Sequence, residues 1–304
     1  MSHGHAHQTA AGAHRGRITI VLGLTLGVAA LQVVGALISG SLALLADAGH
    51  MALDSSGIGL VLAATTIARR PATQRRTFGW QRAEILATLV NSALLLALAV
   101  FVLVGAWRRW QSPESVEGGV MLLFACLGLA VNLIGVALLR QGSRDSLTVR
   151  GAYLEVFSDA AGSVAVIAAA LVVLATGWDR ADVVASVLIA ALILPRAWSL
   201  LREVVDVLLE ATPKDVDLDE VKAHIIGVPG VVDVHDLHAW TITSGVNVLS
   251  AHVVVDASRL GAECGNEAVL DRLQSCLAGH FDVGHSTFQL EPIGHDRHEA
   301  VHHG

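Results

Sequence analysis

Six long apolar runs are the strongest constraint on how this chain can fold. A helix needs about 20 predominantly apolar residues to cross the hydrocarbon core of a bilayer. Because lipid offers the backbone no hydrogen-bond partners, a spanning run has to satisfy its own N–H and C=O groups as a helix. The runs lie at about 18–38, 42–68, 83–107, 117–140, 152–176 and 181–201. We therefore expect an α-helical membrane protein with six transmembrane helices in a lipid bilayer.

The composition agrees with this expectation. Hydrophobic residues make up 53% of the 304 residues and charged residues only 15%, with a mean hydropathy of +0.59. These values are too apolar for an ordinary soluble domain.

The arginines predict the orientation, because cytoplasmic loops carry an excess of basic residues. They gather before the first run, between the second and third, and between the fourth and fifth, and are scarce on the other side. We expect both termini to be cytoplasmic and the chain to be a multi-pass protein of the cell membrane, in a bacterial plasma membrane. The arginines of the first group are Arg15, Arg17, Arg69, Arg70, Arg75, Arg76, Arg82, Arg140, Arg144 and Arg150, and those of the second are Arg108, Arg109 and Arg180.

Charge separates two domains. Residues 203–304 hold seventeen acidic against five basic residues, a balance of −12, whereas residues 1–202 have a balance of +5. An acidic domain of this kind disfavours nucleic acid as a partner and suits a cation. We expect a His-containing cytoplasmic tail at 1–16, the six-helix domain at 17–208, a cytoplasmic domain at 209–292 and a His-rich disordered tail at 293–304.

The cytoplasmic domain has an α-β-β-α-β pattern. A helix at 215–226 follows Pro213, and Val-rich alternating stretches at 231–243 and 246–256 flank a Ser244-Gly245 turn. A helical stretch at 263–281 and a last strand at 285–291 complete the order. This order predicts an α+β, ferredoxin-like domain with two helices on one side of a small sheet.

Two pairs of ionisable residues interrupt the apolar runs: His50 with Asp54, and Glu155 with Asp159. Residues four apart lie on one face of a helix, so each pair presents two donor groups to one point. An ionisable group costs a few kcal/mol inside a membrane, so these four call for a function. Imidazole and carboxylate ligands suit divalent metals, and four ligands suit tetrahedral Zn²⁺. The alternative is polar adhesion between helices, which small amides would provide at lower cost.

Four motifs in order resemble the cation diffusion facilitator family, of the zinc, cadmium and cobalt efflux type, over about residues 15–292. They are Leu45-Ala-Asp-Ala-Gly-His-Met-Ala-Leu-Asp54, Thr77-Phe-Gly-Trp-Gln-Arg-Ala-Glu84, Arg150-Gly-Ala-Tyr-Leu-Glu-Val-Phe-Ser-Asp159 and Val234-His-Asp-Leu-His-Ala-Trp240. The resemblance implies a homodimeric secondary transporter, not an enzyme, that exports divalent metal in exchange for protons. It also implies a transport site made of His50, Asp54, Glu155 and Asp159.

One position departs from the zinc pattern of that family. Glu155 stands where zinc members usually carry a second His, which makes the ligand set harder and more anionic. Zn²⁺ remains the first expectation because His50 is present, with Mn²⁺, Fe²⁺, Co²⁺ or Cd²⁺ as alternatives.

A membrane metalloenzyme or metal sensor is the alternative from another class. The His-Glu-x-x-His pattern occurs only at 298–302, in the tail expected to be disordered and not on a helix of the apolar runs, and the sequence contains no phosphate-binding Gly-Lys-Ser/Thr loop. Transport is therefore the expectation, and metal flux in sealed vesicles separates the two classes.

The resemblance also implies a regulatory metal site in the cytoplasmic domain. Its expected ligands are His235, His252, His285 and Glu291, on the three predicted strands. Gln289 stands where some relatives place a ligand His, which argues against a full two-metal cluster.

The remaining histidines and arginines carry weaker signals. The loop Pro71–Trp80 contains no His, Asp or Glu, so we expect no metal there. Its arginines fit three roles: topology signals, contacts to lipid head groups, or contacts to the acidic domain. The terminal histidines either capture metal weakly or are inert; they are His3, His5, His7, His14, His295, His298, His302 and His303.

Overall fold

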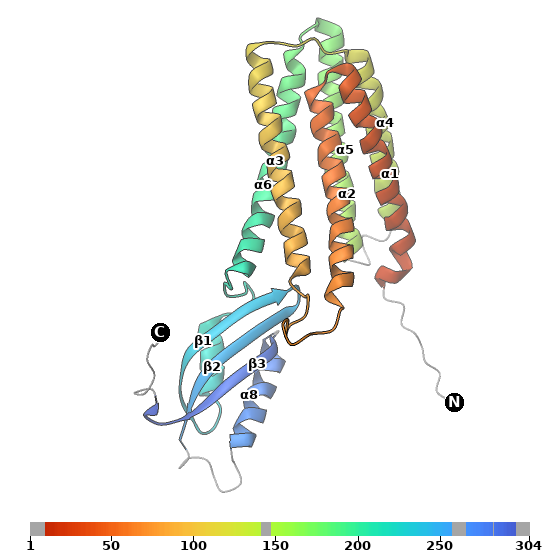
Figure 1. Ribbon diagram of the computed structural model, residues 1–304. Coiled ribbons are helices and arrows are strands. Elements are labelled where there is room, and N and C mark those ends of the chain that lie inside the picture. The colour runs from red at the N-terminus through yellow and green to blue at the C-terminus, as the bar shows by residue number, and fades with distance from the viewer. Residues whose placement is uncertain (1–9, 141–146, 257–265, 282, 296–304) are drawn as a thin grey trace, which may run out of the picture. The chain divides into compact units, whose positions relative to one another are not determined.

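The computed structural model describes residues 10–140, 147–256, 266–281 and 283–295. Six long helices come first along the chain (Figure 1). They are α1 (Ala10–Ser39), α2 (Leu42–Ala68), α3 (Ala83–Gln111), α4 (Gly118–Leu139), α5 (Leu147–Thr176) and α6 (Arg180–Leu208). Each is long and apolar enough to cross a membrane, which confirms the six predicted spans.

The N-terminal helix begins earlier than its apolar run. α1 starts at Ala10, so His14 lies within a helix. The other expected tail histidines, apart from His295, lie outside the described residues.

Contacts within the chain define two compact units. The first comprises Met1–Ala63 and Ala87–Leu201, and the second comprises Ala64–Leu86 and Arg202–Gly304, as far as these ranges are described. The loop between α2 and α3 therefore belongs with the C-terminal residues.

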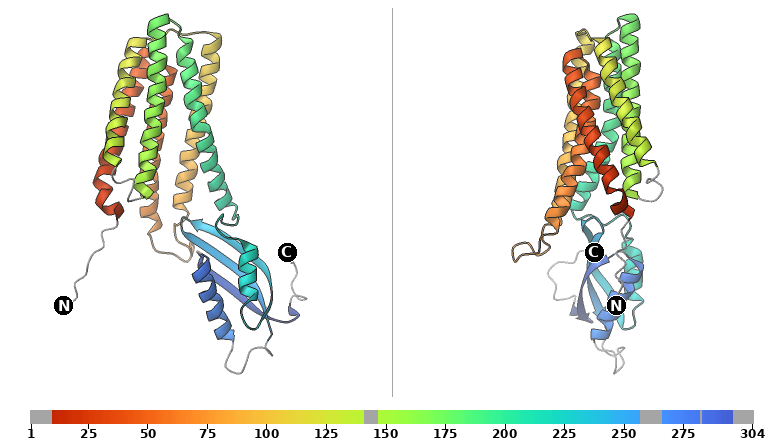
Figure 2. Two further views of the ribbon diagram at one scale, coloured as in Figure 1. Left: turned by 180° about the vertical axis from the view of Figure 1, so that it is seen from behind. Right: turned by 90° about the vertical axis from the view of Figure 1, so that its right-hand side faces the viewer.

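The helices of the first unit bury small residues and expose large apolar ones. Ala43, Ala99 and Ala190 are fully buried, whereas Leu37 and Leu192 are 75% and 62% exposed. Exposed leucines are stable where lipid covers them, and small residues let helices approach closely. α4 packs against both α1 and α5, which run beside it in Figure 2.

A buried carboxylate fixes the start of α2. The carboxylate of Asp182, in the first turn of α6, accepts hydrogen bonds from the backbone N–H groups of Leu42 at 2.8 Å and Ala43 at 3.1 Å. It also accepts one from the hydroxyl of Ser41 at 2.6 Å. These N–H groups have no partner within α2, so the carboxylate of another helix caps α2. α2 carries His50 and Asp54, so this cap helps to position them.

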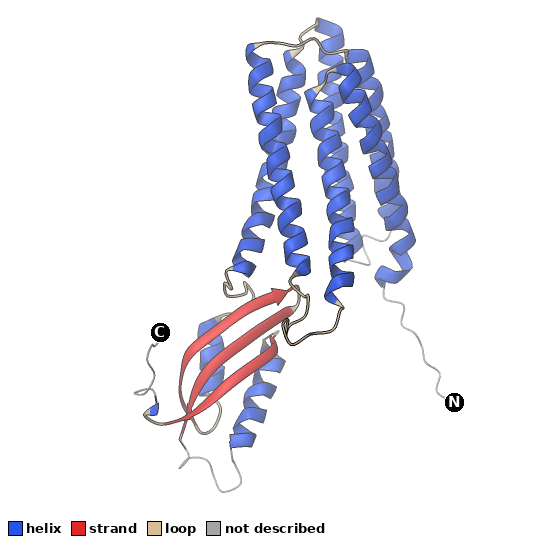
Figure 3. Cartoon of the chain, in the orientation of Figure 1, coloured by secondary structure: helices blue, strands red, loops and turns tan. Residues whose placement is uncertain are grey.

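The second unit contains α7 (Leu218–Ile226), β1 (Val231–Thr243), β2 (Val246–Val255), α8 (Asn266–His280) and β3 (Val283–Pro292). This order confirms the predicted α+β domain. The strands form one sheet in the order β1-β2-β3, with β1 antiparallel and β3 parallel to β2 (Figure 3). α7 and α8 cover one face of this sheet, as the left view of Figure 2 shows.

Local chemistry fixes the ends of these elements. α7 begins at Leu218, later than the predicted 215, because Asp217 accepts hydrogen bonds from the backbone N–H groups of Asp219 and Glu220 and so caps the helix. Gly245 supplies the positive φ of the hairpin turn between β1 and β2.

The loop between α2 and α3 contacts the C-terminal residues of the same unit. Arg82 forms an ion pair of 2.9 Å with Glu210, and the ring of Phe78 lies edge-on to that of His285. Glu84 accepts hydrogen bonds from the hydroxyls of Thr243 at 2.9 Å and Ser244 at 3.1 Å. Arg82 lies just after Pro71–Trp80, so its ion pair with Glu210 does not decide among the three roles weighed for the arginines of that stretch.

Candidate metal centres

The ionisable pairs of α2 and α5 meet inside the helix bundle. His50 Nε2 lies 3.5 Å from Asp54 Oδ2 and 3.6 Å from Asp159 Oδ1. The three residues each offer a ligand atom within 4.8 Å of the other two. Zn²⁺ holds its ligands at about 2.0–2.2 Å, so tetrahedral ligand atoms lie about 3.3–3.6 Å from one another. The observed distances from His50 have the spacing of ligands around one such ion.

These three side chains are buried, and two of their polar atoms lack partners. Their exposed fractions are 9% for His50, 5% for Asp54 and 2% for Asp159. Among the described residues, His50 Nδ1 and Asp159 Oδ1 have no hydrogen-bond partner. A buried polar group without a partner costs free energy, and a bound cation would offset that cost for Asp159. The donor set and its burial therefore fit a metal cargo.

Glu155 shares a neighbour, Arg196, with Asp54. Its Oε1 lies 3.6 Å from Arg196 Nη2, and Arg196 Nη1 lies 3.0 Å from Asp54 Oδ2. Glu155 is thus beside the His50 group, but outside the tight set of three residues. Asp54, Glu155 and Asp159 line one cavity together with apolar residues of α1, α2, α4 and α5. That cavity gives an ion access to three carboxylates at once.

Sequence reasoning missed Arg196. The signal was present, because Arg196 falls inside the sixth apolar run, where a charged residue is a functional hypothesis by default.

A second buried polar group lies one turn away from the first. Asp47 Oδ2 accepts hydrogen bonds of 3.1 Å from Gln32 Nε2 and from the Ser163 hydroxyl, and Asn132 Nδ2 donates to that hydroxyl at 3.4 Å. Asp47 and Ser163 lie three or four residues from the ligands His50 and Asp159 on α2 and α5. This group joins α1, α2, α4 and α5 and holds the two ligand helices at a fixed spacing. The sequence reading quoted Asp47 within a motif and assigned it no role.

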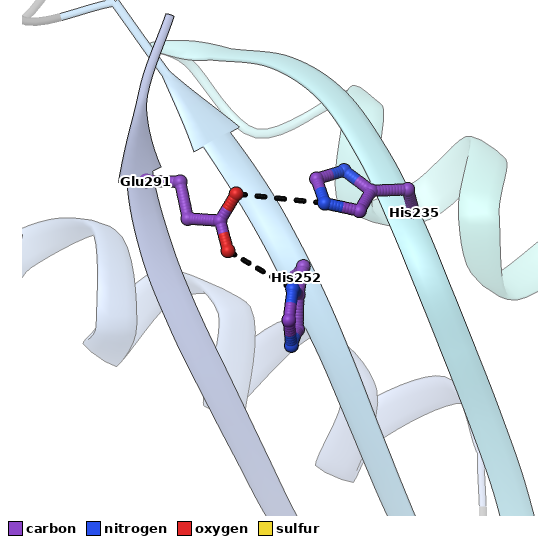
Figure 4. Close-up of side chains that lie close together, drawn as sticks. All are labelled: His235, His252 and Glu291. Atoms are coloured by element: carbon purple, nitrogen blue, oxygen red, sulfur yellow. Dashed lines mark ion pairs between the residues drawn. The ribbon is translucent and has the colours of Figure 1, made fainter. Parts of the chain in front are cut away.

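The C-terminal domain brings three of its four predicted ligands together. His252 Nδ1 lies 2.9 Å from Glu291 Oε1, and His235 Nε2 lies 3.5 Å from Glu291 Oε2 (Figure 4). Glu291 is 1% exposed, and its Oε2 has no hydrogen-bond partner within the described chain. Gln289 donates a hydrogen bond of 2.8 Å to Glu291 Oε1. Two imidazoles and a carboxylate on adjacent strands fit a zinc-type ion.

The register of the sheet explains why these residues meet. His235 pairs with His252 across β1 and β2, and β3 places Gln289 beside His252. A bulge follows His235, where Asp236 has a positive φ of 46°. Bulges of this kind redirect side chains and commonly lie beside functional sites.

The structure does not bring His285 to this group. His285 pairs with Val248 of β2. Along β3 it comes four residues before Gln289, which lies beside His252. At about 3.3 Å per residue, His285 lies about 13 Å along the strand from Gln289. Its ring contacts Phe78 instead, with ring centroids 6.0 Å apart.

Comparison with known proteins identifies the family. Residues 18–209 match the family described as cation efflux transmembrane domain, and residues 213–293 match the family described as cation efflux protein, cytoplasmic domain. The chain belongs to the cation diffusion facilitator family. Both matches together cover nearly all of the described residues.

Several members of this family are similar over their whole length. The metal cation efflux system protein CzcD of Cupriavidus metallidurans is 44% identical over 303 residues, which cover 100% of this chain and 94% of that protein. The zinc transporter ZitB of Escherichia coli is 38% identical, covering 96% and 93%. The cadmium, cobalt and zinc/H⁺-K⁺ antiporter of Bacillus subtilis is 36% identical, covering 98% and 95%.

One solved structure is similar to the C-terminal part. It is the metal-bound C-terminal domain of the CzcD transporter from Cupriavidus metallidurans, 45% identical over 25% of this chain and 99% of that one, with a TM-score of 0.22.

Proposed function

We propose that this membrane protein exports divalent metal from the cytoplasm, with Zn²⁺ as its first substrate, in exchange for protons. The observation that carries the proposal is the buried group of His50, Asp54 and Asp159 in helices long enough to span a bilayer. Its spacing suits one tetrahedral ion, and Glu155 stands close enough to complete a four-ligand set. Relatives named as zinc, or cadmium, cobalt and zinc transporters support the choice of metal.

Exchange with protons follows from the chemistry of the ligands. Carboxylates and imidazole bind a metal only when they are deprotonated, so protons and metal compete for the same atoms. A gradient that reprotonates the ligands on the far side then drives release of the metal. One relative is named as an antiporter of H⁺ and K⁺, which supports a counter-ion.

Other divalent metals form the second candidate substrate class. The site offers three carboxylates and one imidazole, and oxygen ligands admit harder ions such as Mn²⁺, Fe²⁺ and Co²⁺ as well as Cd²⁺. A metal sensor or enzyme remains the alternative class, and it predicts signalling or turnover without flux.

A resident ion in the cytoplasmic domain is the second part of the proposal. His235, His252 and Glu291 would hold it, and the buried Glu291 Oε2 without a partner fits this use. An ion there would supply a cross-link between the three strands of the sheet. We propose that it biases the protein toward one arrangement of a homodimer and thereby tunes transport.

The orientation and division of the chain complete the proposal. An even number of spans puts both termini on one side, and the arginine distribution makes that side the cytoplasm. We place the chain in a bacterial plasma membrane. The six-helix part then extends over 17–208 and the cytoplasmic part over 209–292, between the two His-containing tails.

Zinc flux in sealed vesicles tests the proposal. Purified protein is reconstituted with a zinc-sensitive dye and, separately, a pH-sensitive dye inside the vesicles. We expect zinc uptake with opposite proton movement, and competition by Cd²⁺ and Co²⁺ at similar concentrations. Zinc binding without any flux would favour the sensor class, and flux without proton movement would remove the exchange mechanism.

A further inference from the structure

The feature that the proposed function leaves unused is Arg196, the cation that α6 places beside the carboxylates. Its guanidinium contacts a carboxylate on each of the two ligand helices, Asp54 at 3.0 Å and Glu155 at 3.6 Å. A charged side chain in a spanning helix is costly unless it serves a site. Its side chain is 43% exposed, so the protein itself covers only part of it.

Counting charges shows what Arg196 contributes. Bound to metal, the carboxylates of Asp54, Glu155 and Asp159 carry three negative charges and the imidazole of His50 carries none. A divalent ion leaves this set with a charge of −1, and Arg196 brings the sum to zero. Net charge matters here because a low-dielectric surrounding makes an unbalanced charge expensive.

The same sum identifies Glu155 and Arg196 as a matched pair. A site with an imidazole at position 155 would have two carboxylates and two neutral ligands, and a divalent ion would neutralise it without any arginine. Glu155 adds one negative charge to that set, and Arg196 adds one positive charge beside it. The two residues together therefore have the charge of one neutral ligand.

Arg196 also competes for a ligand atom. The oxygen of Asp54 that faces His50 Nε2 at 3.5 Å is Oδ2, the same oxygen that Arg196 Nη1 contacts. An ion bound between His50 and Asp54 has to share this oxygen with the guanidinium. Arg196 is thus placed to weaken metal binding and to favour release.

We infer that Arg196 is a positioning residue of the transport site, paired with Glu155 so that the metal-loaded site is electrically neutral and can release its cargo. This inference rests on the proposed function. It assigns to the Glu155–Arg196 pair the role of setting affinity and turnover.

The test is a double-mutant cycle on the full-length protein, with two readouts. Zinc affinity of purified protein is measured by competition with a chromophoric chelator, and zinc flux is measured in vesicles. The variants are Glu155→His, Arg196→Gln and both together. Arg196→Lys keeps the charge, and Arg202→Gln removes an exposed arginine of the same helix from outside the site.

The two single changes should move zinc affinity in opposite directions. Arg196→Gln removes a repelling cation, so zinc binds about tenfold more tightly, while flux falls because release slows. Glu155→His leaves a surplus positive charge, so zinc binds about tenfold more weakly. Affinity in the double variant returns to within about threefold of the wild type, as it also would if two opposite effects simply multiplied. Flux therefore reports the coupling: each single change lowers flux, independent sites would lower it further in the double variant, and a matched pair restores it to within about threefold of the wild type.

Four outcomes decide the inference. Recovery in the double variant supports it, and so does flux retained by Arg196→Lys. It is overturned if the flux losses of the two single changes simply multiply in the double variant, or if both single changes weaken zinc binding, as a purely structural role predicts. If the Arg196→Gln protein does not insert into the membrane, the flux of Glu155→His is compared with that of the double variant. Higher flux in the double variant supports the inference, and equal or lower flux overturns it. Absent flux in the wild type and in Arg202→Gln would instead refute the proposed function.

Discussion

His50 Nε2 lies 3.6 Å from Asp159 Oδ1, although His50 belongs to α2 and Asp159 to α5. Residues far apart in the sequence thus converge on one point of the bundle. The buried group around Asp47 holds the same two helices one turn further along. The metal site is therefore built on rigid elements, which favours a fixed ligand geometry.

Asp159→Asn should abolish zinc transport and leave the protein folded. The amide keeps the shape of the side chain and removes the charge that binds metal. Because loss of even an outer partner costs about 10–100-fold in metal affinity, loss of a ligand should cost more than about 100-fold. Competition with a chelator measures the zinc affinity, and flux in vesicles measures the transport. Asp215→Asn, an exposed carboxylate outside the spans, is the matched control. Normal flux at low zinc in Asp159→Asn would remove this residue from the site.

The double change His235→Ala with His252→Ala should remove one class of bound zinc from the full-length protein and lower transport without abolishing it. The three ligands lie on separate strands, so metal acts there by fixing the sheet. We expect a reduction in flux of about fivefold, in the usual range of coupling between distinct sites. Equilibrium dialysis gives the zinc stoichiometry. His238→Ala, on the same strand and exposed, should bind as much zinc as the wild type. Unchanged stoichiometry in the double variant would refute the cytoplasmic site.

Asp182→Ala should destabilise the bundle and impair transport indirectly. The change removes the cap of α2 and leaves the N–H groups of Leu42 and Ala43 without this acceptor. Loss of a helix cap costs about 1 kcal/mol, and more where water cannot replace it. Thermal unfolding in detergent should show a lower midpoint. Glu203→Gln, an exposed carboxylate with a surface ion pair to Lys214, should leave the midpoint unchanged.

Zinc uptake should slow as the pH on the cytoplasmic side falls. Metal occupancy requires deprotonated ligands, so added protons displace zinc from the loading side. Flux is measured at a series of external pH values with the internal pH held constant. The opposite gradient, acidic on the release side, should accelerate transport. Flux that is independent of both pH values would indicate a uniporter.

The double variant Glu155→His with Arg196→Gln should prefer zinc over Mn²⁺ more strongly than the wild type. An imidazole replaces an oxygen donor, which disfavours oxygen-seeking ions more than zinc. Competition between the two metals in the flux assay measures the preference. An unchanged preference for zinc over Mn²⁺ would show that Glu155 is not a ligand of the metal.

The sequence predicts most of this fold because the decisive signals are local. Apolar length identifies the six spans, and alternation with the Ser244-Gly245 turn identifies the hairpin of β1 and β2. Spacing of four residues predicts that His50 with Asp54, and Glu155 with Asp159, lie on one face of α2 and of α5. These features depend on helix and strand periodicity alone.

The remaining features depend on which helices and strands are neighbours. Arg196 reaches Asp54 and Glu155 only because α6 lies beside α2 and α5, which spacing along one helix does not reveal. His285 shares a strand with Glu291, but the register places it too far along the sheet. Asp182 caps α2 only because α6 begins beside the start of α2. Arginines in loops predict the topology, but Arg196 lies inside a span and does not enter that prediction.

The cap that Asp182 forms on α2 has a mechanical consequence. Three hydrogen bonds tie the first turn of α6 to the start of α2, and the residues that form them are buried from replacement partners. α2 and α6 therefore share a hinge point at this end and cannot separate there without breaking all three bonds. A motion that opens the site toward this end has to carry the two helices together. His50 and Asp54 of α2 then move with Arg196 of α6 as one body.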